Sequence, residues 1–135
     1  MSLYVQLENE EFRINGSCEL NYTLTNSGNS VLRVFFPFWY VPSNMIIIYN
    51  DQHDIIRTRM EWEPPPEPNG DDLVTLKPGE SVSRSIMLSN ELYFFETNTT
   101  YNIMGKYIVM EMESIHLPYW RGELFSDIIQ VTITE

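Results

Sequence analysis

Cysteine is almost absent from this sequence, and its absence excludes one common source of stability. Cys18 is the only cysteine among the 135 residues, so no disulfide can form within the chain. The protein must therefore be stabilised by its hydrophobic core alone. The lack of a disulfide favours a reducing compartment. Cys18 lies at an apolar position of an alternating segment, where a thiol usually serves as a small buried group rather than as a nucleophile.

Basic residues are also scarce. The chain has 8 lysines and arginines against 19 acidic residues, which gives a net charge of -11. Such a surface repels nucleic-acid phosphates and anionic lipid headgroups, so we expect neither nucleic acid nor membrane as a partner. The same charge keeps a protein soluble and steers it toward a protein with a basic surface.

Long apolar runs are missing as well. No stretch approaches the roughly 18 apolar residues that a membrane-spanning helix needs. The segment after Met1 is strand-like and lacks the basic and apolar regions of a signal peptide. We expect a cytoplasmic location for the chain as it stands, and a secreted or periplasmic one if a leader has been removed.

The residues that carry most catalytic and metal chemistry are few. His53 lies in a polar turn at 51–54, where two or three potential ligands in a row fall short of the four that Zn²⁺ requires. His116 is followed by Leu-Pro and is predicted to lie in a loop. The Asn-Gly-Asp-Asp segment at 69–72 lacks the spacing of a calcium loop, and the 6 glycines form no phosphate-binding loop. We therefore expect no enzyme activity, no cofactor and no metal.

Strand signals, by contrast, run through the whole sequence. Residues 18–25 alternate apolar and polar side chains with the period of two that is typical of a half-buried strand. Turn residues at 26–30 predict a hairpin with 31–36, and the Lys-Pro-Gly-Glu turn at 77–80 predicts a second hairpin. Strands are expected at 18–25, 31–36, 45–49, 55–60, 73–76, 82–88, 106–112 and 128–133.

These elements predict an all-β protein. About seven to nine short strands with turns between them, and no long amphipathic helix, are typical of an antiparallel two-sheet β-sandwich. Residues 61–72 contain four prolines and form a long loop rather than a linker between domains. Because neither half of the chain holds enough strands to be stable alone, we expect a single domain over residues 1–135.

Four segments, taken in order, resemble a known family. They are LNYTLTN at 20–26, LKPGES at 76–81, GKY at 105–107 and WRGELFS at 120–126. This order is similar to that of bacterial immunoglobulin-like domains of the intracellular proteinase-inhibitor type, and of propeptide-like domains found with some secreted metallopeptidases. The resemblance implies an immunoglobulin-like sandwich, and it implies that Tyr107 packs at a corner between strands as a structural residue. It carries over no catalytic or inhibitory residue.

Large aromatic side chains beside prolines are the best candidates for a binding site. Aromatics on loops commonly anchor protein interfaces, because each buries about 150–250 Å² at little cost in conformational entropy. Trp120 lies within a segment of the resemblance and is interpreted as a core residue. The candidate binding residues are Trp39, Tyr40, Trp62, Pro64, Pro65, Pro66 and Tyr119.

Three functions are compatible with these features. The first is a non-catalytic protein-binding domain that uses loops at one end of the sandwich, with peptidase inhibition or regulation as one form of it. The second is a carbohydrate-binding module that stacks sugars on exposed Trp and Tyr, and the third is an accessory structural domain of a larger protein. A planar row of aromatics on one sheet face would favour sugar, whereas aromatics at loop tips near the prolines would favour a protein partner.

Overall fold

Strand dominates the secondary structure of the protein. A computed structural model describes residues 3–8, 13–14, 17–37, 42–56, 67–89 and 99–133. Its short helices are α1 (Pro42–Met45) and a 3₁₀ turn at Gly70–Asp72. The described residues form nine strands: β1 (Leu3–Glu8), β2 (Arg13–Ile14), β3 (Ser17–Asn26), β4 (Leu32–Phe35), β5 (Ile46–Tyr49), β6 (Leu73–Leu76), β7 (Ser81–Ser89), β8 (Thr99–Val109) and β9 (Gly122–Ile133). The prediction of an all-β protein is confirmed.

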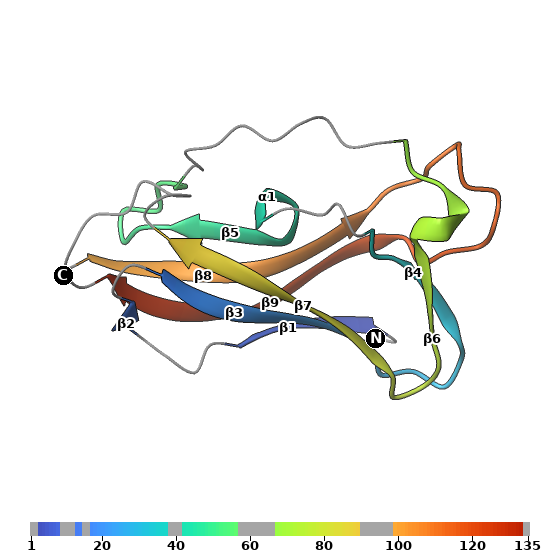
Figure 1. The fold of residues 1–135 in the computed structure, drawn as a ribbon, viewed down its shortest axis with the longest axis horizontal. Helices are drawn as coiled ribbons and strands as arrows, with labels where there is room; N and C mark the ends of the chain where they lie inside the picture. Colours follow the sequence, from blue (N-terminus) through green and yellow to red (C-terminus); the bar gives the residue numbers. More distant parts are fainter. Residues whose placement is uncertain are drawn as a thin grey trace.

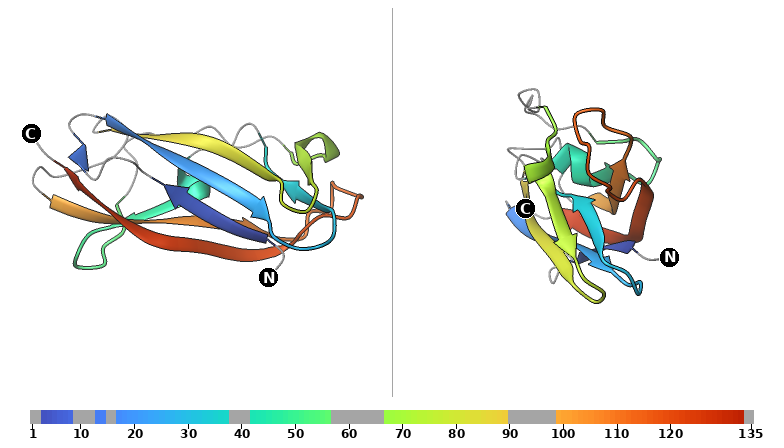
Figure 2. Two further views of the ribbon diagram at one scale, coloured as in Figure 1. Left: turned by 90° about the horizontal axis from the view of Figure 1, so that it is seen from below. Right: turned by 90° about the vertical axis from the view of Figure 1, so that its right-hand side faces the viewer.

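The strands form three sheets. Their strand orders are β1-β3-β7, β2-β9-β8-β5 and β4-β6, and every pair is antiparallel except the short parallel pair of β2 with β9. The two larger sheets lie one over the other, with blue β3 and yellow β7 in one layer and orange β8 and red β9 in the other (Figure 2, left). The small β4-β6 sheet lies at one end of these layers (Figure 1).

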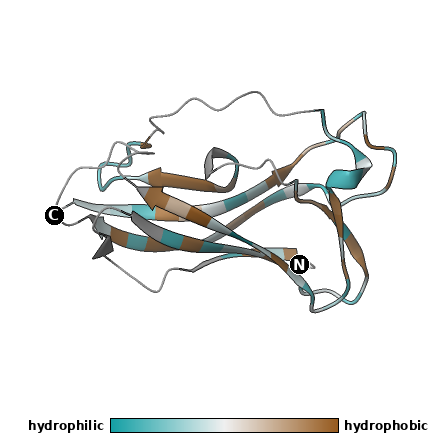
Figure 3. Ribbon diagram, in the orientation of Figure 1, coloured by the Kyte–Doolittle hydropathy of each residue, from teal (hydrophilic) through white to brown (hydrophobic). Residues whose placement is uncertain are grey.

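The core lies between the two larger sheets, because each strand presents alternate side chains to it. In β3 the inward side chains are Leu20, Tyr22 and Leu24, and in β8 they include Tyr101 and Ile103. Bands of hydrophobic and hydrophilic residues along the strands follow this alternation (Figure 3). Each fully buried side chain of this size contributes about 1.5–3 kcal/mol to folding, so the period of two in the sequence is what specifies the sheet faces.

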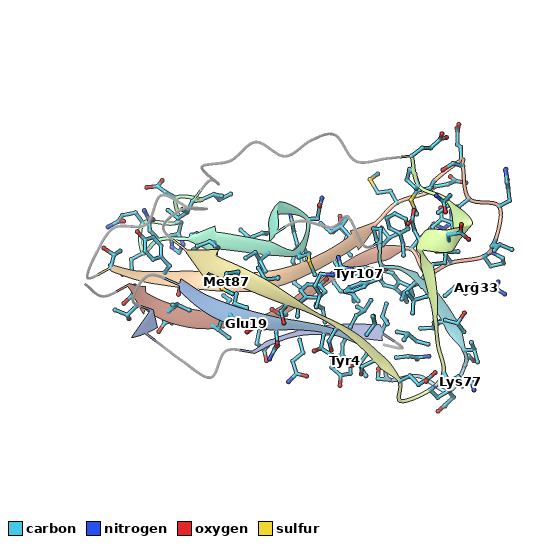
Figure 4. The ribbon with its side chains drawn as sticks, viewed as in Figure 1. Tyr4, Glu19, Arg33, Lys77, Met87 and Tyr107 are labelled. Carbon is cyan, nitrogen blue, oxygen red and sulfur yellow. The ribbon has the colours of Figure 1, made fainter. Side chains whose placement is uncertain are left out.

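Two tyrosine hydroxyls connect elements that are far apart in the sequence. Tyr22 of β3 donates a hydrogen bond to the carbonyl oxygen of Lys106 in β8, at 2.7 Å, and so joins the two larger sheets. Tyr107 donates to the carbonyl oxygen of Phe35 at 2.8 Å in a buried setting. Tyr107 lies inside the molecule, toward the end that carries β4 (Figure 4). Both residues are therefore structural.

Neither predicted hairpin forms. β3 pairs with β1 and β7, whereas β4 pairs with β6, so the connections β3–β4 and β6–β7 each pass from one sheet to another. The turn residues at 26–30 and 77–80 mark bends correctly, and Gly79 has the positive φ of 85° that the Pro-Gly turn requires. Turn chemistry shows where a chain bends but not which sheet it enters next, and this is why the pairing was wrong.

Asn26 holds these two connections together. Its backbone N–H donates to Glu80 O at 3.0 Å, and its carbonyl oxygen accepts from Gly79 N at 2.8 Å. Its fully buried side chain donates to the carbonyl oxygens of Ser30 and Leu76 and accepts from the N–H of Gly28. Asn26 therefore supplies hydrogen bonds at two connections where no hairpin ladder forms.

The extents of three other predicted strands also need correction. The strand expected at 106–112 begins at Thr99 and ends at Val109, and the strand expected at 128–133 begins at Gly122. Of the strand expected at 55–60, Ile55 forms only an isolated bridge with Tyr49, and residues 57–60 lie outside the described residues. β8 and β9 begin earlier than predicted, because pairing with neighbouring strands holds segments in which apolar and polar residues do not clearly alternate.

Candidate functional site

Two loop segments meet at the end of the molecule that carries the β4-β6 sheet. One is residues 67–72, the described end of the proline-containing loop, and the other is residues 110–121, the connection from β8 to β9. The hydroxyl of Ser114 donates to the carbonyl oxygen of Pro68 at 2.5 Å. A Cβ built on Gly70 would lie 3.7 Å from Cδ1 of Leu117, which is ordinary van der Waals contact. We call residues 67–72 and 110–121 together the loop cluster.

The first segment is held in place by a capped 3₁₀ turn. The side chain of Asn69 accepts from Asp71 N at 2.8 Å, and the carboxylate of Asp72 accepts from Asn69 N at 3.1 Å, which forms a capping box. The carbonyl oxygen of Asp72 accepts from Phe36 N at 2.9 Å. The loop therefore has a defined position relative to the end of β4.

Tyr119 holds the second segment by its hydroxyl group. The hydroxyl oxygen accepts a hydrogen bond from Met112 N at 2.5 Å, and the carbonyl oxygen of Met110 lies 3.4 Å from it. Its ring is half-buried against the core, and the guanidinium of Arg121 lies 5.9 Å from the ring centroid. Tyr119 therefore closes the loop on itself and presents one side of its ring at the surface.

Trp120 packs inward, as its interpretation as a core residue predicts. Its ring lies 5.5 Å from that of Tyr107, and its backbone N–H donates to the carbonyl oxygen of Arg33 at 2.8 Å. Gly122 has φ of 148°, and a Cβ there would lie 3.0 Å from the Trp120 ring. The glycine therefore allows the indole ring to lie against the start of β9.

An open pocket of about 290 Å³ lies in this connection. Its walls come from the second segment alone, which folds back on itself between β8 and β9. Ile115 is buried at its base, while Leu117 is half exposed at its rim. The lining residues are Glu111, Met112, Ile115, His116, Leu117, Pro118, Tyr119 and Arg121. The volume suits one or two apolar side chains of a bound segment.

The loop cluster is acidic in composition, and Glu111 is the acidic residue among those that line the pocket. The loop cluster contains a single basic residue, Arg121, whose guanidinium lies 3.7 Å from the carboxylate of Glu111 in an exposed ion pair. Exposed pairs of this kind contribute little to stability, so both side chains can exchange partners at low cost. The acidic residues of the cluster are Glu67, Asp71, Asp72, Glu111 and Glu113.

Only one of the predicted binding side chains lies in this cluster within the described residues. Tyr119 lines the pocket, and the end of the proline-containing loop lies beside it. The other candidates, Trp39, Tyr40, Trp62, Pro64, Pro65 and Pro66, lie outside the described residues. Prediction from the sequence missed Met112, Ile115 and Leu117, because isolated apolar residues between polar ones have the same pattern as a strand or an ordinary loop.

The histidines lie apart from each other and from any cluster of ligands. His53 is exposed in a turn, at φ of 66°, where the side chain of Asn50 accepts hydrogen bonds from Gln52 N and Asp54 N. His116 is exposed at the pocket. Within the described residues no group of three or more His, Cys, Asp or Glu side chains is arranged to hold a metal ion. No helix in the same part of the chain is long and apolar enough to cross a membrane.

Comparison with known proteins finds no family model that matches the chain, and no curated protein matches its sequence significantly. Function is therefore inferred from the geometry of the loop cluster and from the outward faces of the two larger sheets.

Proposed function

We propose that this protein is a non-catalytic protein-binding domain whose loop cluster captures a partner segment. The observation that carries the proposal is the pocket of about 290 Å³, in which apolar side chains lie beside the exposed carboxylate of Glu111. A segment with one large apolar residue and a neighbouring lysine or arginine would fill the pocket and pair with this carboxylate. Apolar anchors in pockets supply most of the affinity of such interfaces, and charges at the rim supply steering.

The proposal includes an immunoglobulin-like sandwich as the scaffold. Support comes from the two facing sheets of largely antiparallel strands and from the buried Tyr107, whose hydroxyl binds the carbonyl oxygen of Phe35. On such a scaffold the connections at one end are free to vary in sequence, so they commonly carry the binding residues. Inhibition or regulation of a peptidase is one form that the binding could take.

The test is selection from a displayed library of short peptides against the intact protein. We expect enrichment of peptides that carry a large apolar residue beside Lys or Arg. We expect Leu117→Glu to weaken their binding at least about tenfold, because it places a charge at the rim of the apolar pocket. Ile55→Glu is the matched control and should leave binding unchanged, because Ile55 is an exposed apolar residue that bridges to Tyr49 at the end of β5 and does not line the pocket.

Two results would count against the proposal. Equal loss of binding in both variants would show that the selected peptides recognise something other than the pocket. No enrichment in any round would remove the case for peptide capture. Incubation with representative serine and metallopeptidases then tests the narrower idea of inhibition, which requires that Leu117→Glu relieve whatever inhibition the wild-type protein produces.

Carbohydrate binding is a second candidate, favoured by the outward face of the β1-β3-β7 sheet. Thr25 and Ser81 share a hydrogen bond of 2.7 Å on this face, Thr23 and Ser83 share one of 3.0 Å, and Tyr4 lies across from Thr25 with 43% of its surface exposed. Hydroxyl groups beside an exposed ring suit a sugar. Tyr4→Ala should then abolish any signal on a glycan array, and retention of that signal would contradict this candidate.

A further inference from the structure

The outward face of the β2-β9-β8-β5 sheet is largely apolar, whereas that of the β1-β3-β7 sheet is rich in hydroxyl groups. In β8 the inward residues are at odd positions, so Met104, Lys106 and Ile108 point away from the core. The register aligns Met104 with Ile47 of β5 and with Ile128 of β9, and it aligns Lys106 with Phe125. We call the outward side chains of Ile47, Met104, Lys106, Ile108, Phe125 and Ile128 the apolar face.

A β-bulge brings the two most exposed members of this face together. The register between β8 and β9 shifts between Met104 and Lys106, and Gly105 N donates to the hydroxyl of Ser126 at 2.7 Å. Because of this shift, outward residues of β9 change from odd to even numbers, so Phe125 and Ile128 both face outward. Without the bulge Ile128 would point into the core.

The apolar face exposes three large apolar side chains on neighbouring strands. Phe125 and Ile128 are 50% and 52% exposed, and Ile108 is 39% exposed. Scattered apolar side chains on a surface need no explanation, but a contiguous group on one sheet face marks an interaction surface. On the opposite sheet the exposed Met87 and Tyr4 stand apart from each other, because the rows between them hold polar side chains: Asn21, Thr23, Ser83 and Ser85.

Charge identifies the kind of partner. On the apolar face and its border lie Lys106 and Glu123, one of each sign, and Asp127 is exposed at the bulge in β9, whereas the whole chain carries a net charge of -11. Two copies of this chain repel each other over most of their surfaces, and they approach with the least repulsion where the net charge is smallest. Lys106 and Glu123 lie in adjacent cross-strand rows, so a two-fold axis through the face can place each opposite its counterpart.

We propose that the apolar face binds a second copy of this chain face to face, forming a two-fold symmetric dimer. The face spans about 15 Å across three strands and about 20 Å along them, or about 300 Å² in projection, which is well below the about 800 Å² per partner that stable interfaces bury. The dimer is therefore weak and depends on protein concentration. It leaves the loop cluster accessible at the end of each copy, so it does not depend on the proposed function.

Sedimentation equilibrium of the purified chain over a wide concentration range is the test. We expect the wild type to associate as a monomer–dimer system. Ile128→Asp should weaken association at least about tenfold, because it places a charge on the most exposed apolar side chain of the contact. Met87→Asp is the matched control, since Met87 is 49% exposed on the opposite sheet, and it should leave association unchanged.

Exchanging the charges of Lys106 and Glu123 distinguishes a specific dimer from nonspecific association. Lys106→Glu should weaken association, and Lys106→Glu combined with Glu123→Lys should restore it toward the wild-type level. A wild type that stays monomeric at every concentration overturns the proposal. So does equal weakening by Ile128→Asp and Met87→Asp with both variants folded by circular dichroism, or a double variant that associates no better than Lys106→Glu.

Discussion

At the scale of single residues, the fold depends on a few polar groups that are buried and fully partnered. Asn26 connects the β3–β4 and β6–β7 passages, and Tyr22 and Tyr107 connect one sheet to another. A buried polar group that keeps its partners costs little, whereas one that loses them costs its full desolvation energy. The tolerance of a position to substitution therefore depends on its hydrogen bonds more than on its polarity.

Asn26→Asp should destabilise the protein by about 2–4 kcal/mol. The change replaces the side-chain NH₂ group, which donates to the carbonyl oxygens of Ser30 and Leu76, by an oxygen that those carbonyl groups repel. Urea denaturation measures the loss. Asn29→Asp makes the same chemical change at an exposed position three residues later and should shift stability by less than about 0.5 kcal/mol. Similar midpoints for the two variants would show that the buried network has little energetic role.

At the scale of elements, the connections determine which sheet the next strand joins, and glycine supplies the backbone conformations that these connections require. Gly79 supplies the positive φ of the turn before β7, and Gly122 supplies both a positive φ and the space for Trp120 at the start of β9. The bulge at Ser126 has a comparable role within a strand, because it changes which side chains of β9 face outward. Backbone conformation at a few positions therefore determines the composition of both the core and the surface.

Gly122→Ala should lower the free energy of unfolding by about 2 kcal/mol and change the tryptophan emission spectrum. The new methyl group would lie 3.0 Å from the Trp120 ring and would occupy a backbone conformation that favours glycine. Gly70→Ala is the control, because its methyl group would make only an ordinary contact with Leu117. If Gly122→Ala unfolds at the same denaturant concentration as Gly70→Ala, the packing of Trp120 against this glycine is not a constraint.

At the scale of the whole molecule, charge repulsion opposes folding. The chain has 19 acidic and 8 basic residues, and the ion pair of Arg121 with Glu111 is exposed. Without a disulfide, the core between the sheets must overcome this repulsion unaided. The separation of the surface into a hydroxyl-rich face, an apolar face and an acidic loop cluster also emerges only at this scale.

Moderate NaCl should raise the thermal unfolding midpoint by a few degrees, because screening shortens the range of the repulsion between carboxylates to about 8 Å at physiological ionic strength. Differential scanning calorimetry at low protein concentration, where the monomer predominates, measures the midpoint. NaCl and KCl should act alike if screening is the cause. A midpoint that falls as NaCl is added would mean that attractive pairs, rather than net repulsion, dominate the electrostatics of the fold.

The sequence predicts the local structure of this protein better than its strand pairing. The all-β character and the inward face of β3 follow from alternation, because side-chain direction in a strand is a local property. The turn at 77–80 follows equally well, since proline and glycine restrict the backbone locally. Tyr119 could be selected as a candidate because aromatic residues beside proline are uncommon in core strands.

What the sequence alone determined is thus the local structure: where strands lie, where the chain bends and which side chains face inward. The tertiary structure decided which strands pair, so that two expected hairpins became two passages between sheets tied by Asn26. It also decided that Pro68 lies beside Ser114, that Leu117 borders a pocket, and that Phe125 and Ile128 share one face. The contact of Pro68 with Ser114 joins residues distant in sequence, and the shared face of Phe125 and Ile128 depends on the register of β9 against β8. Such arrangements depend on the simultaneous packing of all the strands, which no local pattern records.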